Sequence, residues 1–209
     1  MFYRVRNHRI LAKTALAFLL VIAPLWAAQA ATSPLNVIQS GTERALKILH
    51  TSQKGEAPSL RQRKGEILTI VDEYFNFEEM GKRALGRPWK DQSQEKRQQF
   101  VALFKQLLFN TYISRVESYT GSNEKVMYDS EKIDGDYALV KTHVTLQNGQ
   151  AAQIDYRLHV ESGQWKVYDV VVEGISFVEN YRSQFASILA NGSFDTLLKK
   201  LQEKVDQSA

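Results

Sequence analysis

One acidic residue interrupts a stretch that otherwise predicts a buried strand. Asp169 lies within the valine-rich segment Val167–Val172, and the strand pairing expected from the neighbouring turns places it opposite Tyr156. A carboxylate in an apolar cavity can act as a general base. It can also bind the Tyr156 hydroxyl or the backbone amides at a helix start, because buried polar groups are normally paired. We favour the structural role, since no nucleophile, metal set or second acid accompanies Asp169, and keep an enzyme that uses it as the alternative.

Other signatures of catalysis are missing from the sequence. The segment Gly174–Ser176 lacks the second glycine of a nucleophile elbow, and Gly-Lys at 81–82 lacks the upstream glycine of a phosphate-binding loop. The histidines after residue 30 are His50, His143 and His159, and they do not have the spacing of metal ligands. The sequence therefore predicts no metal and no cofactor, and it disfavours an enzyme.

The first thirty residues have the composition of an export signal. Basic residues precede the apolar run Thr14–Trp26, and Ala-Gln-Ala at 28–30 has the small-x-small form of a signal-peptidase site. The run is short for a membrane span, so we expect cleavage rather than a retained anchor. We predict a signal peptide at residues 1–30 and a single domain at residues 31–209.

Cleavage changes the charge balance. The chain has 27 Lys+Arg and 23 Asp+Glu, and four of the basic residues lie in the first thirty, which leaves 23 of each sign. A domain without net charge gives no support for binding nucleic acid or an anionic lipid surface. The sequence has no cysteine, so lipid anchoring through a cysteine is excluded and no disulfide is expected. We expect a free, soluble domain.

Residues 31–121 are predicted to be helical. Helix starts are expected at Ser33, Ser59, Asn76 and Ser93, where a capping side chain precedes an apolar period of three to four residues. The longest helix, from Ser93 to about residue 119, is apolar over more than one face. Such a helix is either covered on two sides or lines a cavity, and a central core helix is the simpler interpretation.

Residues 122–173 are predicted to form a four-stranded antiparallel meander, because three hairpin-turn dipeptides recur at even spacing. The register follows if the apolar faces of neighbouring strands coincide. It pairs Val144 with Ala152 across a three-residue loop, and Val160 with Trp165 across a two-residue turn. Continued without interruption, this register gives the position of Asp169 described above.

Residues 174–209 are predicted to form the C-terminal helices. Ser176 and Ser193 are expected to cap them, with a helix stop at Asn191-Gly192 between. The fold class is therefore α+β, a four-stranded antiparallel meander covered on one face by about six helices that enclose an apolar pocket. The periodicity does not distinguish a pocket left open for an apolar ligand from a well-filled core.

Four segments resemble the MlaC-type proteins, the toluene-tolerance family of periplasmic phospholipid shuttles. The most specific is V-Y-D-V-V-V-E-G-I-S-F-V at residues 167–178, followed by G-S-F-D-T-L-L-K-K-L at 192–201. Further similarity lies in Y-F-N-F-E-E-M-G-K-R-A-L-G at 74–86 and F-V-A-L-F-K-Q-L-L-F-N-T-Y at 100–112. The resemblance extends from about residue 67 to residue 201, whereas residues 31–60 match only in being helical.

The resemblance implies a soluble periplasmic carrier whose cargo is a diacyl phospholipid, with the tails between sheet and helices and the head group at the mouth. It implies a monomer that moves lipid between an outer-membrane lipoprotein complex and an inner-membrane ABC transporter. From helix face and strand pattern, the residues predicted to line the tails are Val71, Phe75, Phe104, Leu108, Tyr112, Val140, Val144, Ile154, Tyr156, Val171, Val178 and Tyr181. A small-molecule enzyme using Asp169 and a chaperone-like interaction protein are the alternatives.

Overall fold

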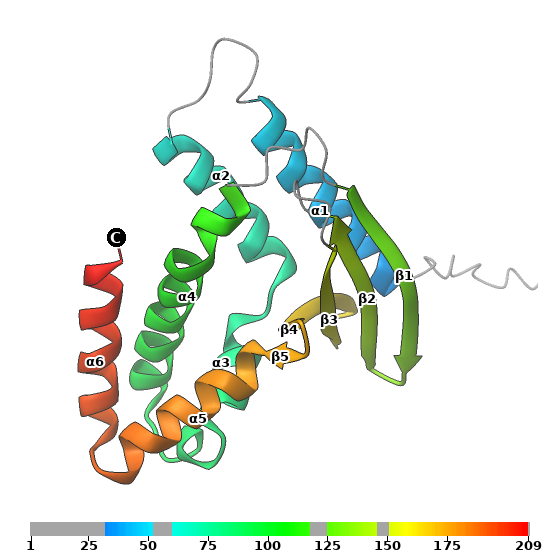
Figure 1. Cartoon of the computed structure of the whole chain (residues 1–209). Coiled ribbons are helices and arrows are strands. Elements are labelled where there is room, and N and C mark those ends of the chain that lie inside the picture. Colours follow the sequence, from blue (N-terminus) through cyan, green and yellow to red (C-terminus); the bar gives the residue numbers. More distant parts are fainter. Residues whose placement is uncertain (1–31, 52–59, 118–124, 146–150, 209) are drawn as a thin grey trace, which may run out of the picture. The chain divides into compact units, whose positions relative to one another are not determined.

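The computed structural model describes residues 32–51, 60–117, 125–145 and 151–208 (Figure 1). Helices come first, then a sheet, then two further helices, which is the order predicted from the sequence. The helices are α1 (Pro34–Thr51), α2 (Leu60–Tyr74), α3 (Phe77–Leu85), the short 3₁₀ helix η1 (Arg87–Trp89), α4 (Gln94–Glu117), α5 (Phe177–Ala190) and α6 (Phe194–Gln207). The strands are β1 (Lys125–Asp134), β2 (Tyr137–Thr145), β3 (Ala151–Glu161), β4 (Gln164–Val172) and β5 (Ile175–Ser176).

Local capping signals start the helices as expected. The side chains of Asn76, Ser176 and Ser193 each accept a hydrogen bond from the backbone N–H three residues further on, at 2.8, 3.1 and 3.2 Å. These bonds satisfy donors that the first turn of a helix leaves unpaired. Among the described residues, none of the helices is long and apolar enough to cross a bilayer.

The sheet is an antiparallel meander in the order β1-β2-β3-β4-β5. The prediction of four strands was one short, because β5 adds a two-residue strand in which Ser176 pairs with Val171. Glu173 and Gly174 both adopt positive φ angles, 49° and 78°, so the chain reverses tightly and pairs with β4 before α5 begins. The fourth strand therefore ends where the predicted sheet ends, at about residue 173, but the chain pairs with it once more before α5 begins.

The predicted register is confirmed at both central hairpins. Val144 pairs with Ala152 and Val160 with Trp165. The loop between β2 and β3, for which three residues were predicted, lies at 146–150 and is outside the described residues.

One part of the predicted register is wrong. A bulge at Tyr168 inserts one extra residue into β4, so Asp169 lies opposite Arg157, and Tyr156 pairs with Val170 instead. The Tyr168 ring packs under the guanidinium of a residue from α3, Arg83, which lies 4.0 Å from the ring centroid. That contact gives the displaced side chain a packing partner on α3, beside the helical core.

Two buried clusters hold the elements together. In the first, Ile38 of α1 packs with the sheet residues Val140, Leu158 and Val167, all fully buried in the strands. In Figure 1, α1 lies along β1 and β2, with α2 between it and α4. The sheet is thus covered on this face by α1, while α2 joins it to the remaining helices.

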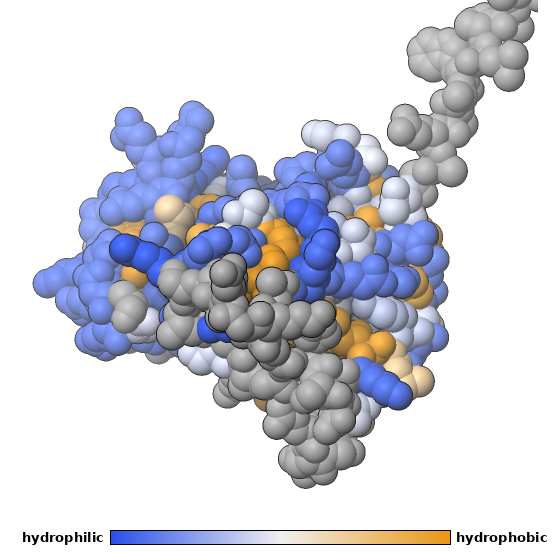
Figure 2. Space-filling model, turned by 90° about the horizontal axis from the view of Figure 1, so that it is seen from above, coloured by the Kyte–Doolittle hydropathy of each residue, from blue (hydrophilic) through white to orange (hydrophobic). Residues whose placement is uncertain are grey.

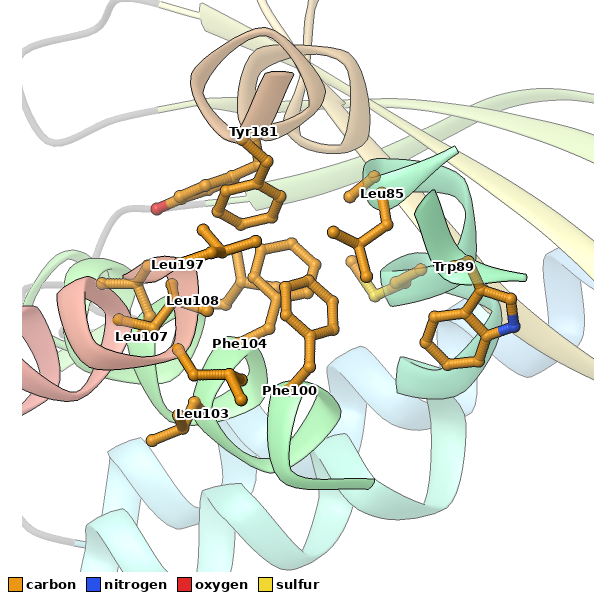
Figure 3. Close-up of a cluster of buried hydrophobic side chains, with 14 of the residues drawn as sticks. Leu85, Trp89, Phe100, Leu103, Phe104, Leu107, Leu108, Tyr181 and Leu197 are labelled. Carbon is orange, nitrogen blue, oxygen red and sulfur yellow. The ribbon is translucent and has the colours of Figure 1, made fainter. Parts of the chain in front are cut away.

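The second cluster is an aromatic core formed by α3, α4, α5 and α6. Phe100 and Phe104 of α4 are fully buried, and each meets the ring of Phe185 in α5 edge-on at a centroid distance of 5.4 Å. Figure 3 shows Leu85 and Leu197 pointing into the same cluster from α3 and α6. The broad apolar surface of α4 is therefore used by helices on more than one side.

Candidate functional site

An apolar cavity of about 250 Å³ lies between α1, α2 and the inner face of the sheet. Seen from above, apolar surface is visible within a hydrophilic surround (Figure 2). The lining is almost entirely hydrocarbon, so the cavity suits an apolar ligand rather than a polar one. The lining residues are Val37, Ile38, Gly41, Thr42, Ala45, Leu46, Leu49, Ile67, Ile70, Val71, Tyr74, Phe75, Val126, Val144, Tyr156 and Val167.

The sequence of α1 accounts for the space. Its cavity-facing positions are large near the ends, at Ile38 and Leu49, and smaller in the middle, at Thr42 and Ala45. The end residues are buried and hold the helix in place, while the short side chains between them leave a gap over the sheet. The cavity is therefore lined by apolar side chains, and the side chains of the protein do not fill it.

A second cavity, of about 160 Å³, lies on the other side of α2, where α3, α4, β4 and the start of α5 meet. It shares Ile67, Val71 and Phe75 with the first cavity, so this part of α2 borders both. One wall is made by Tyr112 and Phe177, whose rings stack 4.2 Å apart and nearly parallel. The two cavities therefore form one apolar region divided by the side chains of α2.

A polar cluster ties α1 to α2 beside the first cavity. The Tyr74 hydroxyl lies 3.0 Å from the Ser40 hydroxyl and accepts a hydrogen bond from Arg44 at 3.2 Å. Arg44 also forms an ion pair with Glu73 at 2.6 Å. These side chains are partly exposed, so each contact contributes little stability, but together they fix the spacing of the two helices over the cavity.

The Tyr74 ring also depends on a glycine. A methyl group at Gly41 would lie 3.1 Å from Cδ1 of Tyr74, which is closer than side chains normally pack. The absence of a side chain there allows α1 and α2 to approach each other. The cavity is therefore closed on this side by close helix packing.

Asp169 lies outside both cavities and has structural partners. It is 1 % exposed, and its carboxylate accepts hydrogen bonds from the Ser176 hydroxyl at 2.6 Å, the Val178 backbone N–H at 3.0 Å and Arg157 at 2.9 Å. The predicted pairing with a helix start is confirmed, and Tyr156 lies opposite Val170 instead of Asp169. Every oxygen of this carboxylate is already engaged in holding β4 to α5.

The two strand histidines each bond to one polar side chain. His143 lies 2.8 Å from Asp129 on β1, and His159 lies 3.1 Å from the Asn76 side chain. Within the described parts of the chain, no group of three histidine or acidic side chains is arranged to hold a metal ion.

The family follows from comparison with known proteins. Residues 39–203 match the family described as "MlaC protein". This chain belongs to the MlaC family. It is 30% identical over 187 residues to the intermembrane phospholipid transport system binding protein MlaC of Haemophilus influenzae, which covers 85% of each chain.

Two further proteins are similar to this chain. The toluene tolerance protein ttg2D of Pseudomonas putida is 33% identical over 102 residues, 48% of this chain and 46% of that protein. The phospholipid-binding protein of Ralstonia solanacearum, solved in complex with a phospholipid, has the same fold with a TM-score of 0.75 at 24% identity, over 86% of this chain and 99% of that one. The family and the α+β fold predicted from the sequence are both confirmed.

Six of the twelve residues predicted to line the tails border the cavities of this MlaC-family chain. Two of them, Val71 on α2 and Phe75 directly after it, border both cavities. The six are Val71, Phe75, Leu108, Tyr112, Val144 and Tyr156. Their contact with lipid itself stays a prediction.

The other six lie elsewhere, for three reasons. Phe104, Val178 and Tyr181 belong to the aromatic core between α4 and α5, where Tyr181 meets Phe104 edge-on at 5.1 Å. Val140 and Ile154 pack in the cluster under α1 without bordering a cavity.

The sixth, Val171, is displaced by the bulge at Tyr168. The alternation was predicted without the extra residue, which put Val171 on the inner face. With the bulge, Val170 lines the second cavity and Val171 pairs with Asp155 on β3.

The prediction missed the contribution of α1. Four residues of α1 that recur every three or four positions, Ile38, Thr42, Ala45 and Leu49, line the first cavity of this MlaC-family chain. None of them was among the residues predicted to line the tails. The run of small residues in the middle of that face was the available signal.

Proposed function

We propose that this chain is a periplasmic carrier that holds a diacyl phospholipid with its tails in the two apolar cavities beside α2. The observation that carries the proposal is the hollow between α1, α2 and the sheet, which is lined by hydrocarbon from three separate elements. The second cavity, sharing Val71 and Phe75 with the first, extends the apolar space under α4. The names of the Haemophilus and Ralstonia proteins, a phospholipid transport protein and a phospholipid-binding protein, support the same ligand class.

The energetics explain why such a lipid needs a carrier. Exposing acyl tails to water costs about 0.8 kcal/mol per methylene, which is roughly 20–25 kcal/mol for a diacyl lipid. Ligand sites usually have volumes of about 300–1,000 Å³. The two cavities, of about 250 and 160 Å³, are each smaller than that range, so loading requires α1 and α2 to move away from the sheet.

The proposed route runs between two membranes. A cleaved signal peptide at residues 1–30 would release residues 31–209 into the periplasm as a single, monomeric domain. There it would exchange lipid with an outer-membrane lipoprotein complex and with the periplasmic face of an inner-membrane ABC transporter, and so maintain the lipid asymmetry of the outer membrane. The sequence has no phosphate-binding loop, so the energy for directional transfer would come from the transporter.

The test is to identify what the protein carries. The protein is purified without detergent, extracted with organic solvent and analysed by mass spectrometry. Diacyl phospholipid in a fixed ratio to protein is the expected result. A polar metabolite, or protein that is empty and takes up no phospholipid from vesicles, would overturn the proposal in favour of an enzyme or a chaperone-like protein.

A further inference from the structure

Two basic residues extend the cavity-lining face of α2 beyond the end of the cavity. Ile67 and Val71 line the first cavity four residues apart, on one face of the helix. Arg63 and Lys64 precede Ile67 by four and three residues, so they continue this face toward the start of α2. At about 1.5 Å per residue, they lie roughly one helical turn, or about 5 Å, beyond the apolar lining.

Arg63 carries a donor without an acceptor. Its Nε is shielded from solvent and has no hydrogen-bond partner among the residues that the structure describes. In the same described parts of the chain, neither Arg63 nor Lys64 forms an ion pair, although both side chains are half-buried. A shielded guanidinium N–H without an acceptor is unfavourable, and an anionic oxygen bound there would remove that cost.

At the C-terminal end of α2, the nearby positive charge is already paired. Arg44, which lies on α1, is bonded to Glu73 at 2.6 Å and to the Tyr74 hydroxyl at 3.2 Å. Glu73 places a negative charge beside the cavity there. An anion therefore finds unpaired positive charge only at the Arg63 end of this α2 face, as far as the described residues go.

We propose that Arg63 and Lys64 bind the phosphate of the lipid head group, which rests on the proposed function of the cavity. In a diacyl phospholipid the phosphate is joined to the glycerol that carries both tails, so tails against Ile67 and Val71 bring it next to the basic pair. Arginine presents a planar fork that matches phosphate oxygens, and lysine adds a mobile point charge. The site thus selects lipids with a phosphate over lipids with the same tails and a neutral head.

The experiment compares single-charge variants of full-length mature protein after removal of bound lipid. Arg63→Gln and Lys64→Gln test the site. Arg61→Gln is the matched control, because it removes the same charge from the same helix at an exposed position two residues from Arg63 and off the cavity face. The probes are dioleoyl phosphatidylglycerol, dioleoylglycerol, which has the same tails without phosphate, and inorganic phosphate as a competitor.

We expect Arg63→Gln to weaken binding of dioleoyl phosphatidylglycerol about tenfold, as the loss of a hydrogen bond to a charged group predicts, and to leave dioleoylglycerol unchanged. Lys64→Gln should have the same selectivity with a smaller effect, and Arg63→Lys should recover part of the loss. Arg61→Gln should bind both lipids like the wild type. Added salt should reduce the preference of the wild type for the phospholipid.

Three results would overturn the inference. The first is a folded Arg63→Gln variant that binds both lipids like the wild type, and the second is one that loses both equally, which indicates a structural role. The third is displacement of the phospholipid by millimolar inorganic phosphate, which indicates a site for the free ion. A wild-type protein that binds neither lipid would instead refute the proposed carrier function.

Discussion

The carboxylate of Asp169 on β4 accepts a hydrogen bond from the backbone N–H of Val178 in the first turn of α5, at 3.0 Å. The same carboxylate binds the hydroxyl of Ser176, the residue that caps this helix. Between these two partners lies Phe177, whose ring forms part of the wall of the second cavity. The acid therefore positions one wall of the apolar region from outside it.

Replacing Asp169 by Ala should destabilise the fold by about 3 kcal/mol, because a buried carboxylate with three donors is removed and the donors lose their acceptor. Equilibrium unfolding in urea measures the change. Arg157→Gln is the comparison: its side chain is 42% exposed, so water can replace the lost contact and we expect a loss of about 1 kcal/mol or less.

Asp169→Asn distinguishes structure from catalysis at this position. We expect it to lose stability and, through the altered start of α5, to carry lipid less firmly. A variant that is as stable as the wild type and still carries lipid, but has lost biological activity, would contradict this and favour the enzyme alternative.

Much of the fold was predictable because its signals are local. The caps at Asn76, Ser176 and Ser193 depend on a side chain and a backbone N–H three residues away, so the sequence alone indicates them. The ring of Tyr168, at the bulge, packs against Arg83, which is distant in sequence. No local pattern indicates that contact. The residues of β4 that follow the bulge were therefore assigned to the wrong face of the strand.

The candidate site was less predictable for a related reason. The spacing of apolar residues along a helix indicates which side chains point inward. The inward positions of Val71, Phe75 and Leu108 were therefore predicted correctly. Whether an inward side chain meets a cavity or another side chain depends on the distance between elements. Phe104 points inward as predicted, but α5 lies against it and leaves no space.

Val144→Trp should abolish lipid co-purification while the protein still folds. Val144 is 4% exposed and borders the first cavity, so the larger ring can enter about 250 Å³ of apolar space and occupy the volume meant for a tail. Met127→Trp, on the neighbouring strand at 52% exposure, is the control and should retain lipid. Ile154→Trp should have a smaller effect, because Ile154 does not border the cavity. Lipid is quantified by mass spectrometry, and full lipid content in a folded Val144→Trp protein would count against the site.

Two glycines in neighbouring helices should respond differently to the same methyl group. Gly65 of α2 is exposed and has open space around it, so Gly65→Ala should stabilise the protein by about 1 kcal/mol through helix propensity. Gly41→Ala gains the same propensity but places its methyl 3.1 Å from the Tyr74 ring, so it should lose most of that gain. Thermal unfolding of the two variants tests this, and equal increases in Tm would show that α1 and α2 are not closely packed there.

The alkaline stability of the protein should depend on Tyr181. Burial raises the pKa of Tyr181 above its ordinary value near 10, and a hydrogen bond with Thr111 offsets only part of the effect. Because the unfolded chain ionises first, the contribution of this residue is fully present below about pH 10 and is lost as the pH rises through the higher pKa of the folded state. Tyr181→Phe keeps the ring in the aromatic core and removes the ionisable group. The free energy of unfolding of Tyr181→Phe should therefore fall less steeply than that of the wild type between about pH 9 and 11. Urea denaturation at each pH measures it. Identical slopes for the two proteins would show that Tyr181 ionises as easily in the folded protein as in the unfolded chain.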